Sequence, residues 1–308
     1  MEDDTGSKQQ TCAGGQVTAI CCPMKAFLPI LCLWLTSAFL SATEPTHANV
    51  EYARIGDLAL RLDLRLPAAA RPPIIIYVHG GAWRAGSKSD VPIVKLLDHG
   101  FAIASVDYRL STQATFPAQI HDIKAAIRFL RAKADQWNID AKRIAIVGSS
   151  AGGHLAALTG LSNGHAELEG TVGSHLDQSS QVDAIVSFYG ASNLQSILSQ
   201  STEFGLSVRV PALKLLLGEL PDQAPALAKL ASPISHLDTK DPPLLMIHGD
   251  ADPQMPLAQS EELHQACKNR EIASKLIILP GAKHGGDEFY NHEHLLLVAE
   301  FLKQYLSP

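Results

Sequence analysis

Apolar and polar positions alternate in the first folded segment of the chain. Residues 50–66, VEYARIGDLALRLDLRL, place an apolar side chain at about every second position. Because successive side chains of a strand point to opposite faces, this pattern predicts antiparallel strands with one exposed face. Residues 74–81, IIIYVHGG, follow a proline-rich turn and are apolar without alternation at their start. This β-branched run predicts a central strand that is buried on both faces.

Helical and strand patterns alternate through the rest of the sequence. Residues 119–134 carry Ile120, Ile123, Ile127 and Leu130 at the three- and four-residue spacing of one helix face. Further strands are predicted at FAIASVDYR, RIAIVGSS, VDAIVSFYG, PPLLMIHGD and SKLIILPG, and further helices at 257–268 and 293–305. Strands that alternate with helices indicate an α/β fold, with a mostly parallel central sheet flanked by helices.

One interval breaks this alternation. Between about residues 191 and 233, the stretches NLQSILSQS and ALKLLLGEL predict short helices inserted after the end of a strand. α/β folds carry substrate-selecting segments at such positions. We therefore expect a small helical cap inserted into a single domain that spans residues 49–308.

Composition narrows the classes of protein that the chain can represent. The 308 residues are 46% hydrophobic, which is enough for one large core, and the net charge is −6. Lysine and arginine are scattered along the chain and form no basic stripe. This charge distribution argues against a nucleic-acid partner.

Residues 1–48 have the character of a leader. From Met24 to Ala42, a lysine, an apolar stretch and a run of small residues follow one another as in a secretory signal. We expect translation to begin at Met24, cleavage after Ala42 or Ala48, and an exported protein with no stable membrane association. The alternative is a membrane anchor formed by an uncleaved signal. Four of the five cysteines lie in this leader, which leaves Cys267 alone in the mature chain.

The stretch GSSAG contains two adjacent serines, and the glycines around them select one. Gly148, Ser150 and Gly152 fit the pattern G-x-S-x-G, in which a buried strand turns sharply into a helix. Residues two before and two after the central serine must lack side chains, because the turn brings neighbouring elements very close. Ser149 has Val147 and Ala151 at those positions. Ser150 is therefore the candidate nucleophile.

A serine hydroxyl needs a histidine to accept its proton and an acid to orient that histidine, in the chain order Ser, acid, His. Asp250 and Asp252 follow one predicted strand, and His284 follows the next. We favour Asp252 as the acid because it lies beyond the strand end, whereas Asp250 is placed to bond the backbone of the turn. His284 is the candidate base. His248 and His154 lie in apolar surroundings and are predicted to pack in the core.

Main-chain donors for a developing negative charge are also present. Gly80 and Gly81 end a buried strand, and the N–H of Ala151 begins the helix after Ser150. Each donor of an oxyanion hole is typically worth about 3 kcal/mol in the transition state. Trp83, beside these glycines, has two readings: it stacks on a sugar or aromatic acyl group of the substrate, or it packs the loop.

Seven segments together resemble a known enzyme family: HGGAW, VDYRL, FPAQIHDIKAAIRFLR, GSSAGGHLAAL, SPISHL, PPLLMIHGDADPQMP and GAKHG. They resemble bacterial bifunctional feruloyl and acetyl-xylan esterases, relatives of the hormone-sensitive-lipase-like enzymes. The resemblance covers residue 50 to the C-terminus and implies an α/β-hydrolase fold. It also implies a triad of Ser150, Asp252 and His284, an oxyanion hole of Gly80, Gly81 and Ala151, and structural roles for Asp107, Arg109 and Asp122. Two positions depart from the family pattern: Ala82 replaces a common third glycine, and Ser149 replaces a common acidic residue.

These observations predict a serine carboxylic-ester hydrolase that works through an acyl-enzyme, on short-acyl or carbohydrate-linked esters. This chemistry requires neither a metal nor an organic cofactor. Two alternatives remain open at this point. One is a serine peptidase or amidase of the same fold, and the other is a non-catalytic glycan-binding protein of hydrolase fold.

Overall fold

The computed structural model describes residues 44–307. The predicted translation start at Met24 and a cleavage site after Ala42 fall outside the described residues. The other predicted cleavage position, Ala48, lies inside the first strand. In residues 44–307, no helix is both long and apolar enough to cross a membrane.

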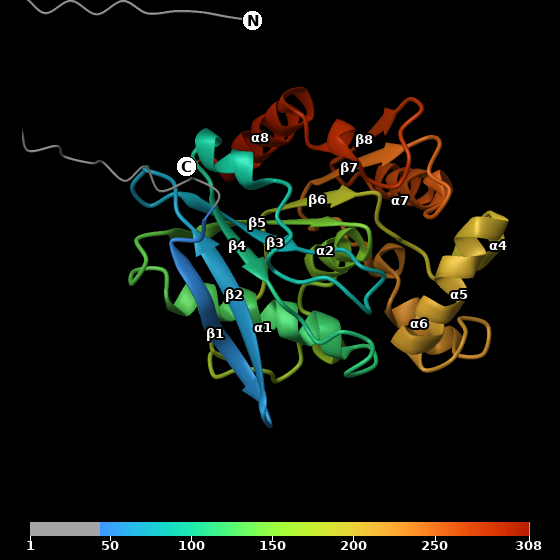
Figure 1. Cartoon of the computed structure of the whole chain (residues 1–308), viewed down its shortest axis with the longest axis horizontal. Helices are drawn as coiled ribbons and strands as arrows, with labels where there is room; N and C mark the ends of the chain where they lie inside the picture. Colours follow the sequence, from blue (N-terminus) through green and yellow to red (C-terminus); the bar gives the residue numbers. More distant parts are fainter. Residues whose placement is uncertain (1–43, 308) are drawn as a thin grey trace, which may run out of the picture. The chain divides into compact units, whose positions relative to one another are not determined.

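An eight-stranded sheet forms the centre of the fold (Figure 1). Its strands are β1 (His47–Ile55), β2 (Leu58–Arg65), β3 (Pro73–Val78), β4 (Ala102–Val106), β5 (Asp140–Ser149), β6 (Ala184–Phe188), β7 (Leu244–Gly249) and β8 (Ser274–Leu279). They lie in the order β1-β2-β4-β3-β5-β6-β7-β8. β2 is antiparallel to β1 and to β4, and all other neighbours are parallel. The predicted antiparallel start and mostly parallel sheet are confirmed.

Helices cover both faces of this sheet. They are α1 (Ala118–Ala132), α2 (Ala151–Leu161), α3 (Ala166–Glu169), α4 (Ile197–Gln200), α5 (Glu203–Leu217), α6 (Pro225–Leu230), α7 (Leu257–Asn269) and α8 (His292–Leu306). Short 3₁₀ helices occur at η1 (Val94–His99), η2 (Pro233–His236) and η3 (Asp287–Phe289). α1, α2 and α7 share one hydrophobic cluster with the sheet, and η1 and α8 share the other. The helices predicted at 119–134, 257–268 and 293–305 are therefore present.

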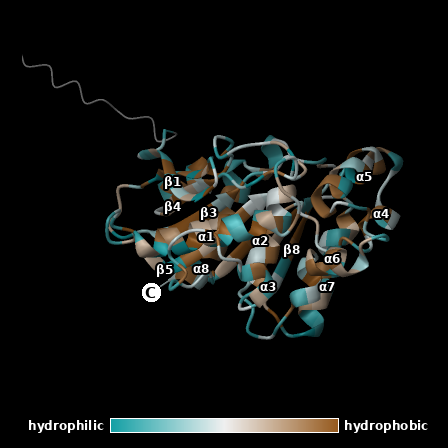
Figure 2. Ribbon diagram, turned by 90° about the horizontal axis from the view of Figure 1, so that it is seen from below, coloured by the Kyte–Doolittle hydropathy of each residue, from teal (hydrophilic) through white to brown (hydrophobic). Residues whose placement is uncertain are grey.

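β3 shows why the central strands are apolar without alternation. Ile74, Ile76 and Val78 are buried in the cluster with α1 and α2, while Ile75 and Tyr77 are buried in the cluster with α8. Both faces of the strand are covered, so every position favours an apolar side chain. Figure 2 shows the hydrophobic residues gathered on the strands between the helices.

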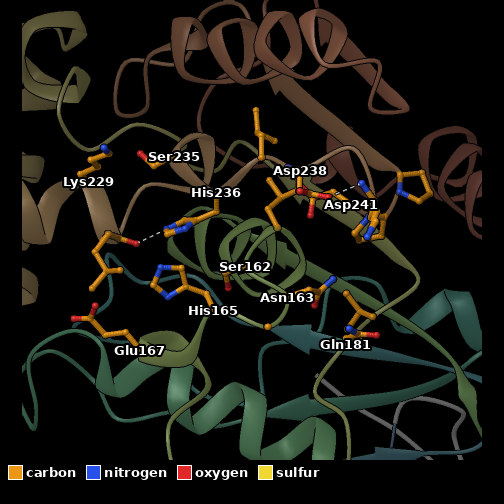
Figure 3. A pocket seen from close by; sticks show the side chains of 18 of the residues that line it. Ser162, Asn163, His165, Glu167, Gln181, Lys229, Ser235, His236, Asp238 and Asp241 are labelled. Carbon is orange, nitrogen blue, oxygen red and sulfur yellow. Dashed lines mark hydrogen bonds between the residues drawn. The ribbon is translucent and has the colours of Figure 1, made fainter.

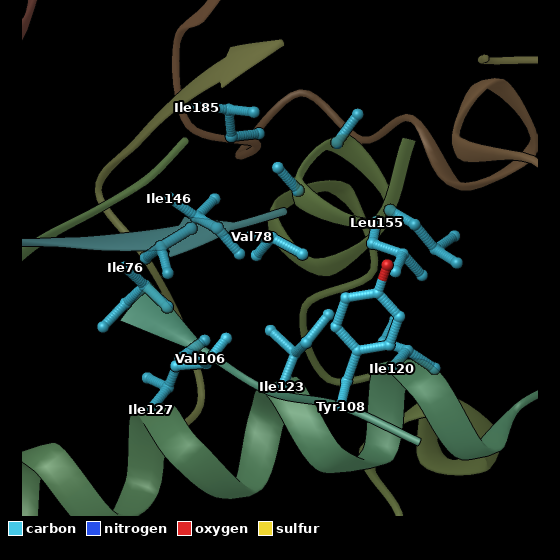
Figure 4. Packing of buried hydrophobic residues seen from close by; sticks show 14 of the residues in the cluster. Ile76, Val78, Val106, Tyr108, Ile120, Ile123, Ile127, Ile146, Leu155 and Ile185 are labelled. Carbon is cyan, nitrogen blue, oxygen red and sulfur yellow. The ribbon is translucent and has the colours of Figure 1, made fainter. Parts of the chain in front are cut away.

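The predicted apolar face of α1 supplies one layer of the core. Ile120, Ile123 and Ile127 are fully buried and point from α1 toward the strands, where they meet Val78 and Val106 (Figure 4). Full burial of an isoleucine side chain stabilises the folded state by about 1.5–3 kcal/mol. This packing fixes α1 against the sheet from which the site is built.

The segment between β6 and β7 holds α4, α5 and α6, on the side of the molecule toward which β6 points (Figure 1). α5 is longer than the predicted helix and begins earlier, at Glu203. Its N-cap is Thr202, whose hydroxyl accepts a hydrogen bond from the N–H of Gly205 at 3.0 Å. Gly218 ends it in a left-handed conformation, which any other residue type adopts less readily. The predicted helical stretch ALKLLLGEL thus forms only the last turns of α5 and the residues after it.

Candidate active site

Three side chains from distant parts of the chain meet at the carboxyl edge of the sheet. The Oγ of Ser150, between β5 and α2, lies 2.8 Å from Nε2 of His284, which follows β8. The Nδ1 of His284 lies 2.6 Å from Oδ2 of Asp252, which follows β7. Because a carboxylate only accepts, Nδ1 carries the proton and Nε2 is free to accept from the serine hydroxyl. This arrangement allows the hydroxyl of Ser150 to transfer its proton to the imidazole of His284.

Ser150 sits in a strained turn that only small neighbours permit. Its φ is 55° and its ψ is −118°. A Cβ on Gly148 would lie 2.2 Å from the carbonyl oxygen of Gly152, and a Cβ on Gly152 would lie 2.0 Å from that of Val78. Both distances are far shorter than a van der Waals contact. Positions 148 and 152 must therefore lack a side chain, as the sequence pattern predicts. A non-glycine residue at positive φ marks stored strain of the kind found at functional sites.

Ser149 takes no part in this relay. Its Oγ lies 3.1 Å from the hydroxyl of Tyr77 and 2.6 Å from that of Tyr290. Tyr290 in turn lies 2.7 Å from the hydroxyl of Tyr189. Ser149 therefore anchors a tyrosine network behind Ser150.

The side chain of Asp252 is buried and is held as an anion. Burial alone would raise its pKa, but hydrogen bonds with His248 and His284 and with the main chain outweigh burial and lower the pKa well below its usual range. Oδ1 accepts from the N–H groups of Gln254 at 2.8 Å and Met255 at 2.9 Å. The other acidic candidate, Asp250, is exposed. It bonds the main chain, but of the turn after β8 and not of its own turn: Oδ1 accepts from the N–H of Gly281 at 2.6 Å.

His248 is buried in the core, as predicted, but it also touches Asp252. Its Nε2 lies 3.0 Å from the carbonyl oxygen of Met255 and 3.4 Å from Oδ2 of Asp252. The carbonyl oxygen can only accept, so Nε2 carries the proton, and Nδ1 contacts the Oγ of Ser260 at 2.7 Å. His248 thus positions the aspartate from behind, a contact that its place inside an apolar strand does not reveal.

The main-chain groups predicted for the oxyanion lie beside Ser150. A Cβ on Gly80 would lie 3.4 Å from the Cβ of Ser150, so this backbone passes directly next to the serine. In the described chain, no hydrogen bond engages the N–H of Gly80 or of Gly81. Ala151 is the first residue of α2, so its N–H has no partner within that helix. The carbonyl of Gly81 accepts from Arg84 and Ala85, both at 3.0 Å, which closes the loop tightly.

Trp83 does not contact the pocket, and its reading as a substrate-binding residue is wrong. Its exposed fraction is 0%, and its indole Nε1 donates to Nδ1 of His154 at 3.0 Å. Burial lowers the pKa of His154 to about 4, so the ring stays neutral and accepts this bond. The second reading of Trp83, packing of the loop, is the one that the structure supports.

Ser150 and His284 line a pocket of about 520 Å³ together with Gly80, Gly81 and Gln254. The remaining lining residues that matter for its chemistry are Tyr189, Tyr290, Arg84, Asp90 and Arg209. None of these five is among the site residues predicted from the sequence. Tyr189 follows the end of β6, and Arg209 stands between two valines within α5. Both features can be read from the sequence.

A larger cavity, of about 1490 Å³, lies elsewhere (Figure 3). Residues 181–183 and 240–243, which precede β6 and β7, line it together with His165 and His236. It therefore opens at the amino ends of the strands, opposite the triad. Ligands of open α/β sheets bind at the carboxyl ends. We assign the chemistry to the smaller pocket for this reason.

The three residues predicted to be structural are engaged in structural contacts. The guanidinium of Arg109 holds the buried carboxylate of Asp122 at 2.7 and 2.8 Å. Oδ1 of Asp107 accepts from the N–H of Lys88 at 2.8 Å. Among residues 44–307, no cluster of three or more His, Cys, Asp or Glu side chains is arranged to hold a metal ion.

A parallel sheet of this strand order, with a serine in a sharp turn after β5, defines an α/β-hydrolase. The chain belongs to the BD-FAE family, whose profile matches residues 62–267. The predicted fold class and family resemblance are both confirmed.

Curated relatives of this chain include esterases. Esterase LipC of Mycobacterium tuberculosis is 32% identical over 76% of this chain and 57% of its own length. Esterase LipQ of the same organism is 32% identical over 72% of this chain and 52% of its own length. The chain thus spans about half the length of these relatives.

Solved structures share the fold over nearly their whole length. A truncated form of a carbohydrate esterase from gut microbiota has a TM-score of 0.78 and 34% identity, covering 84% of this chain and 95% of that one. The Est2 esterase of Thermogutta terrifontis with propionate bound has a TM-score of 0.70 and 27% identity, covering 86% of this chain and 97% of that one. Est2 is also known phosphonylated by sarin, with a TM-score of 0.71 and 26% identity over the same shares.

Proposed function

We propose that this protein is a serine carboxylic-ester hydrolase that works through an acyl-enzyme. One observation carries the proposal: the continuous chain from Ser150 Oγ to His284 Nε2 at 2.8 Å and from His284 Nδ1 to Asp252 Oδ2 at 2.6 Å. Family membership and the esterases among the relatives support the same chemistry.

In the first half of the reaction, Ser150 Oγ attacks the ester carbonyl carbon while its proton passes to Nε2 of His284. The carbonyl oxygen becomes an anion and accepts hydrogen bonds from the N–H groups of Gly80, Gly81 and Ala151. His284 then gives the proton to the departing alcohol oxygen, and the acyl group stays on Ser150. The ionised Asp252 stabilises the imidazolium in between.

In the second half, water takes the place of the alcohol. His284 accepts a proton from the water, whose oxygen attacks the acyl carbon and forms the second oxyanion. When this tetrahedral intermediate breaks down, the bond to Ser150 Oγ is cleaved, the acid is released and His284 returns the proton to Ser150 Oγ. The cycle consumes one water and needs no further reactant.

We place the substrate among short-acyl or carbohydrate-linked esters. A carbohydrate esterase and an esterase bound to propionate are among the structures that the chain resembles. A pocket of about 520 Å³ accommodates a small acyl group together with part of an alcohol such as a sugar.

A panel of acetylated xylan, feruloyl esters, short 4-nitrophenyl esters and matched amides separates an esterase from an amidase or peptidase. A glycan-binding protein would turn over none of them.

The proposed nucleophile is tested with the two adjacent serines. Ser150→Ala is expected to lower kcat for 4-nitrophenyl acetate by about 10⁴-fold or more, because no other group can form the acyl-enzyme. Ser149→Ala is the matched control, since its hydroxyl contacts Tyr77 and Tyr290 and not His284. Circular dichroism verifies that both variants fold. A folded Ser150→Ala that keeps its activity would overturn the assignment.

We further propose that the protein is exported. The pattern from Met24 to Ala42 supports a cleavable signal, and cleavage after Ala42 would leave β1 whole, whereas cleavage after Ala48 would remove its first residues. Expression of the full chain with cell fractionation and N-terminal sequencing tests this. A product that keeps Met24 and stays with the membrane would favour the uncleaved anchor.

A further inference from the structure

Arg209 is a buried cation whose terminal nitrogens have no partner. It lies on α5, in the insertion, with an exposed fraction of 1%. Its Nε donates to the carbonyl oxygen of Gln254 at 3.3 Å. Nη1 and Nη2 are buried and make no hydrogen bond within the described chain. Most buried guanidinium groups are paired, because an unpaired buried charge is strongly unfavourable.

The side chain keeps its charge at neutral pH. Burial lowers the pKa of Arg209 to about 10, and the charge of Asp252 opposes this shift. Asp252 is not its ion-pair partner, because both carboxylate oxygens are occupied by His284 and by the N–H groups of Gln254 and Met255. The two terminal nitrogens of a guanidinium that is charged at neutral pH are thus left without an acceptor.

Arg209 is one of the residues that line the same pocket as Ser150 and His284. Among the lining residues, the other arginine and carboxylate side chains are Arg84 and Asp90, both exposed. The arginine and carboxylate charges of the described lining therefore sum to about +1. A guanidinium matches a carboxylate in two parallel hydrogen bonds, a geometry that an ammonium cannot reproduce. The pocket therefore combines an ester-cleaving group with a receptor for one negative charge.

We propose that Arg209 binds an anionic group, a carboxylate, of the ester that Ser150 attacks. The preferred substrates are then esters with a free acid on the acyl or the alcohol part, such as half-esters of dicarboxylic acids or acylated acidic sugars. Arg209 is a specificity-determining residue and takes no part in bond breaking. This inference rests on the proposed esterase function.

Two pairs of substrates locate the charge. Mono-4-nitrophenyl glutarate against 4-nitrophenyl pentanoate places a carboxylate on the acyl side, and 4-acetoxybenzoate against 4-acetoxybenzamide places it on the alcohol side. Each pair is measured as the ratio of kcat/KM for the charged ester to that for the neutral one. In one of the two pairs, Arg209→Met is expected to lower this ratio at least about tenfold, the effect of losing a charge-assisted hydrogen-bond pair.

Two further variants serve as controls. Arg209→Lys keeps the charge without the fork, so it is expected to retain part of the ratio. Arg84→Gln removes an exposed charge at the same pocket, and its effect on the ratio is expected to stay below about threefold because solvent screens it. A purely structural role of Arg209 would lower kcat/KM for both members of a pair alike and leave the ratio unchanged.

If Arg209→Met does not fold, inhibition of the wild-type protein decides. Glutarate is expected to compete with 4-nitrophenyl acetate at least about tenfold more strongly than glutaramide. Equal inhibition by the two, or an unchanged ratio in both substrate pairs, overturns the proposal. A wild-type protein that cleaves neutral esters without such a preference refutes this inference alone, whereas one that cleaves no ester at all refutes the proposed function.

Discussion

At the scale of single residues, Gly152 shows how a backbone clash fixes the position of a reactive side chain. The carbonyl oxygen of Val78 occupies the place where a Cβ of Gly152 would stand. The close approach of α2 to β3 is what turns the chain sharply at Ser150. The same crowding at Gly148 explains why Ser150, and not its neighbour, points its hydroxyl at His284.

Gly152→Ala should therefore destabilise the fold. The added methyl meets backbone on β3, which cannot yield by rotating a side chain, so we expect a loss of about 3 kcal/mol in the free energy of unfolding, at the upper end for overpacking. Urea unfolding followed by circular dichroism measures it. Gly164→Ala is the control: its φ is 73° and nothing lies within 4 Å, so it reports left-handed strain alone, about 1 kcal/mol. Equal losses in the two variants would refute crowding as the cause.

At the scale of elements, the short turns at the strand ends determine the surroundings of the ionisable side chains that they carry. The turn before β7 is an example at the amino edge. The N–H of Asp238 donates to Oδ2 of Asp241 at 2.7 Å, and the N–H of Asp241 donates to the carbonyl oxygen of Asp238 at 3.0 Å. Burial, with the nearby charge of Asp238, raises the pKa of Asp241 to about 6. This carboxyl group is ionised at neutral pH, although burial and the charge of Asp238 favour its protonated form.

The sign of its effect on stability follows from linkage. The folded state binds the proton of Asp241 more tightly than the unfolded chain does, so the contribution of Asp241 to stability falls as pH rises from about 4 to about 6. Asp241→Asn removes this penalty and keeps an acceptor for the N–H of Asp238. We expect a gain of about 1–2 kcal/mol at pH 8, after allowance for solvent screening of the half-buried group.

Urea unfolding at pH 8 and pH 4.5 measures this gain, which should shrink at the lower pH. Asp222→Asn, at an exposed position, is the control and is expected to change the free energy of unfolding by less than about 0.5 kcal/mol at both pH values. A variant Asp241→Asn that is less stable than the wild type at pH 8 would contradict the burial argument.

At the scale of the whole molecule, the sheet was predictable from sequence because its faces are chemically distinct. Unalternated runs such as 74–81 lie between two layers of helices, and the alternating residues 50–66 form the antiparallel edge. The ends of the strands are predictable for the same reason, and the serine, the acid and the histidine could therefore be assigned to them in that chain order. The start of α5 is not predictable in this way, because its first turns carry little apolar periodicity and depend on the Thr202 cap.

The contacts that the sequence did not reveal depend on how turns bend in space. Trp83 follows the two glycines, yet left-handed backbone at Ala82 and Trp83 turns the indole inward to His154. In the sequence, His248 cannot be distinguished from an ordinary core histidine. Its contact with Asp252 arises because the turn after β7 brings Asp252 back against it. Arg209 lies about forty residues before that turn and reaches the pocket only because α5 packs over Gln254.

The proposed esterase function depends on Ser150, activated by His284, as the residue that forms the acyl-enzyme. Its most direct test is to label the wild-type protein with a fluorophosphonate, digest it and fragment the peptide that contains both serines in a mass spectrometer. If Ser150 is the nucleophile, we expect one phosphonyl group per chain, attached to Ser150, and no label in Ser150→Ala. A label on Ser149 or on any other residue, or none in a folded wild-type protein, would contradict it.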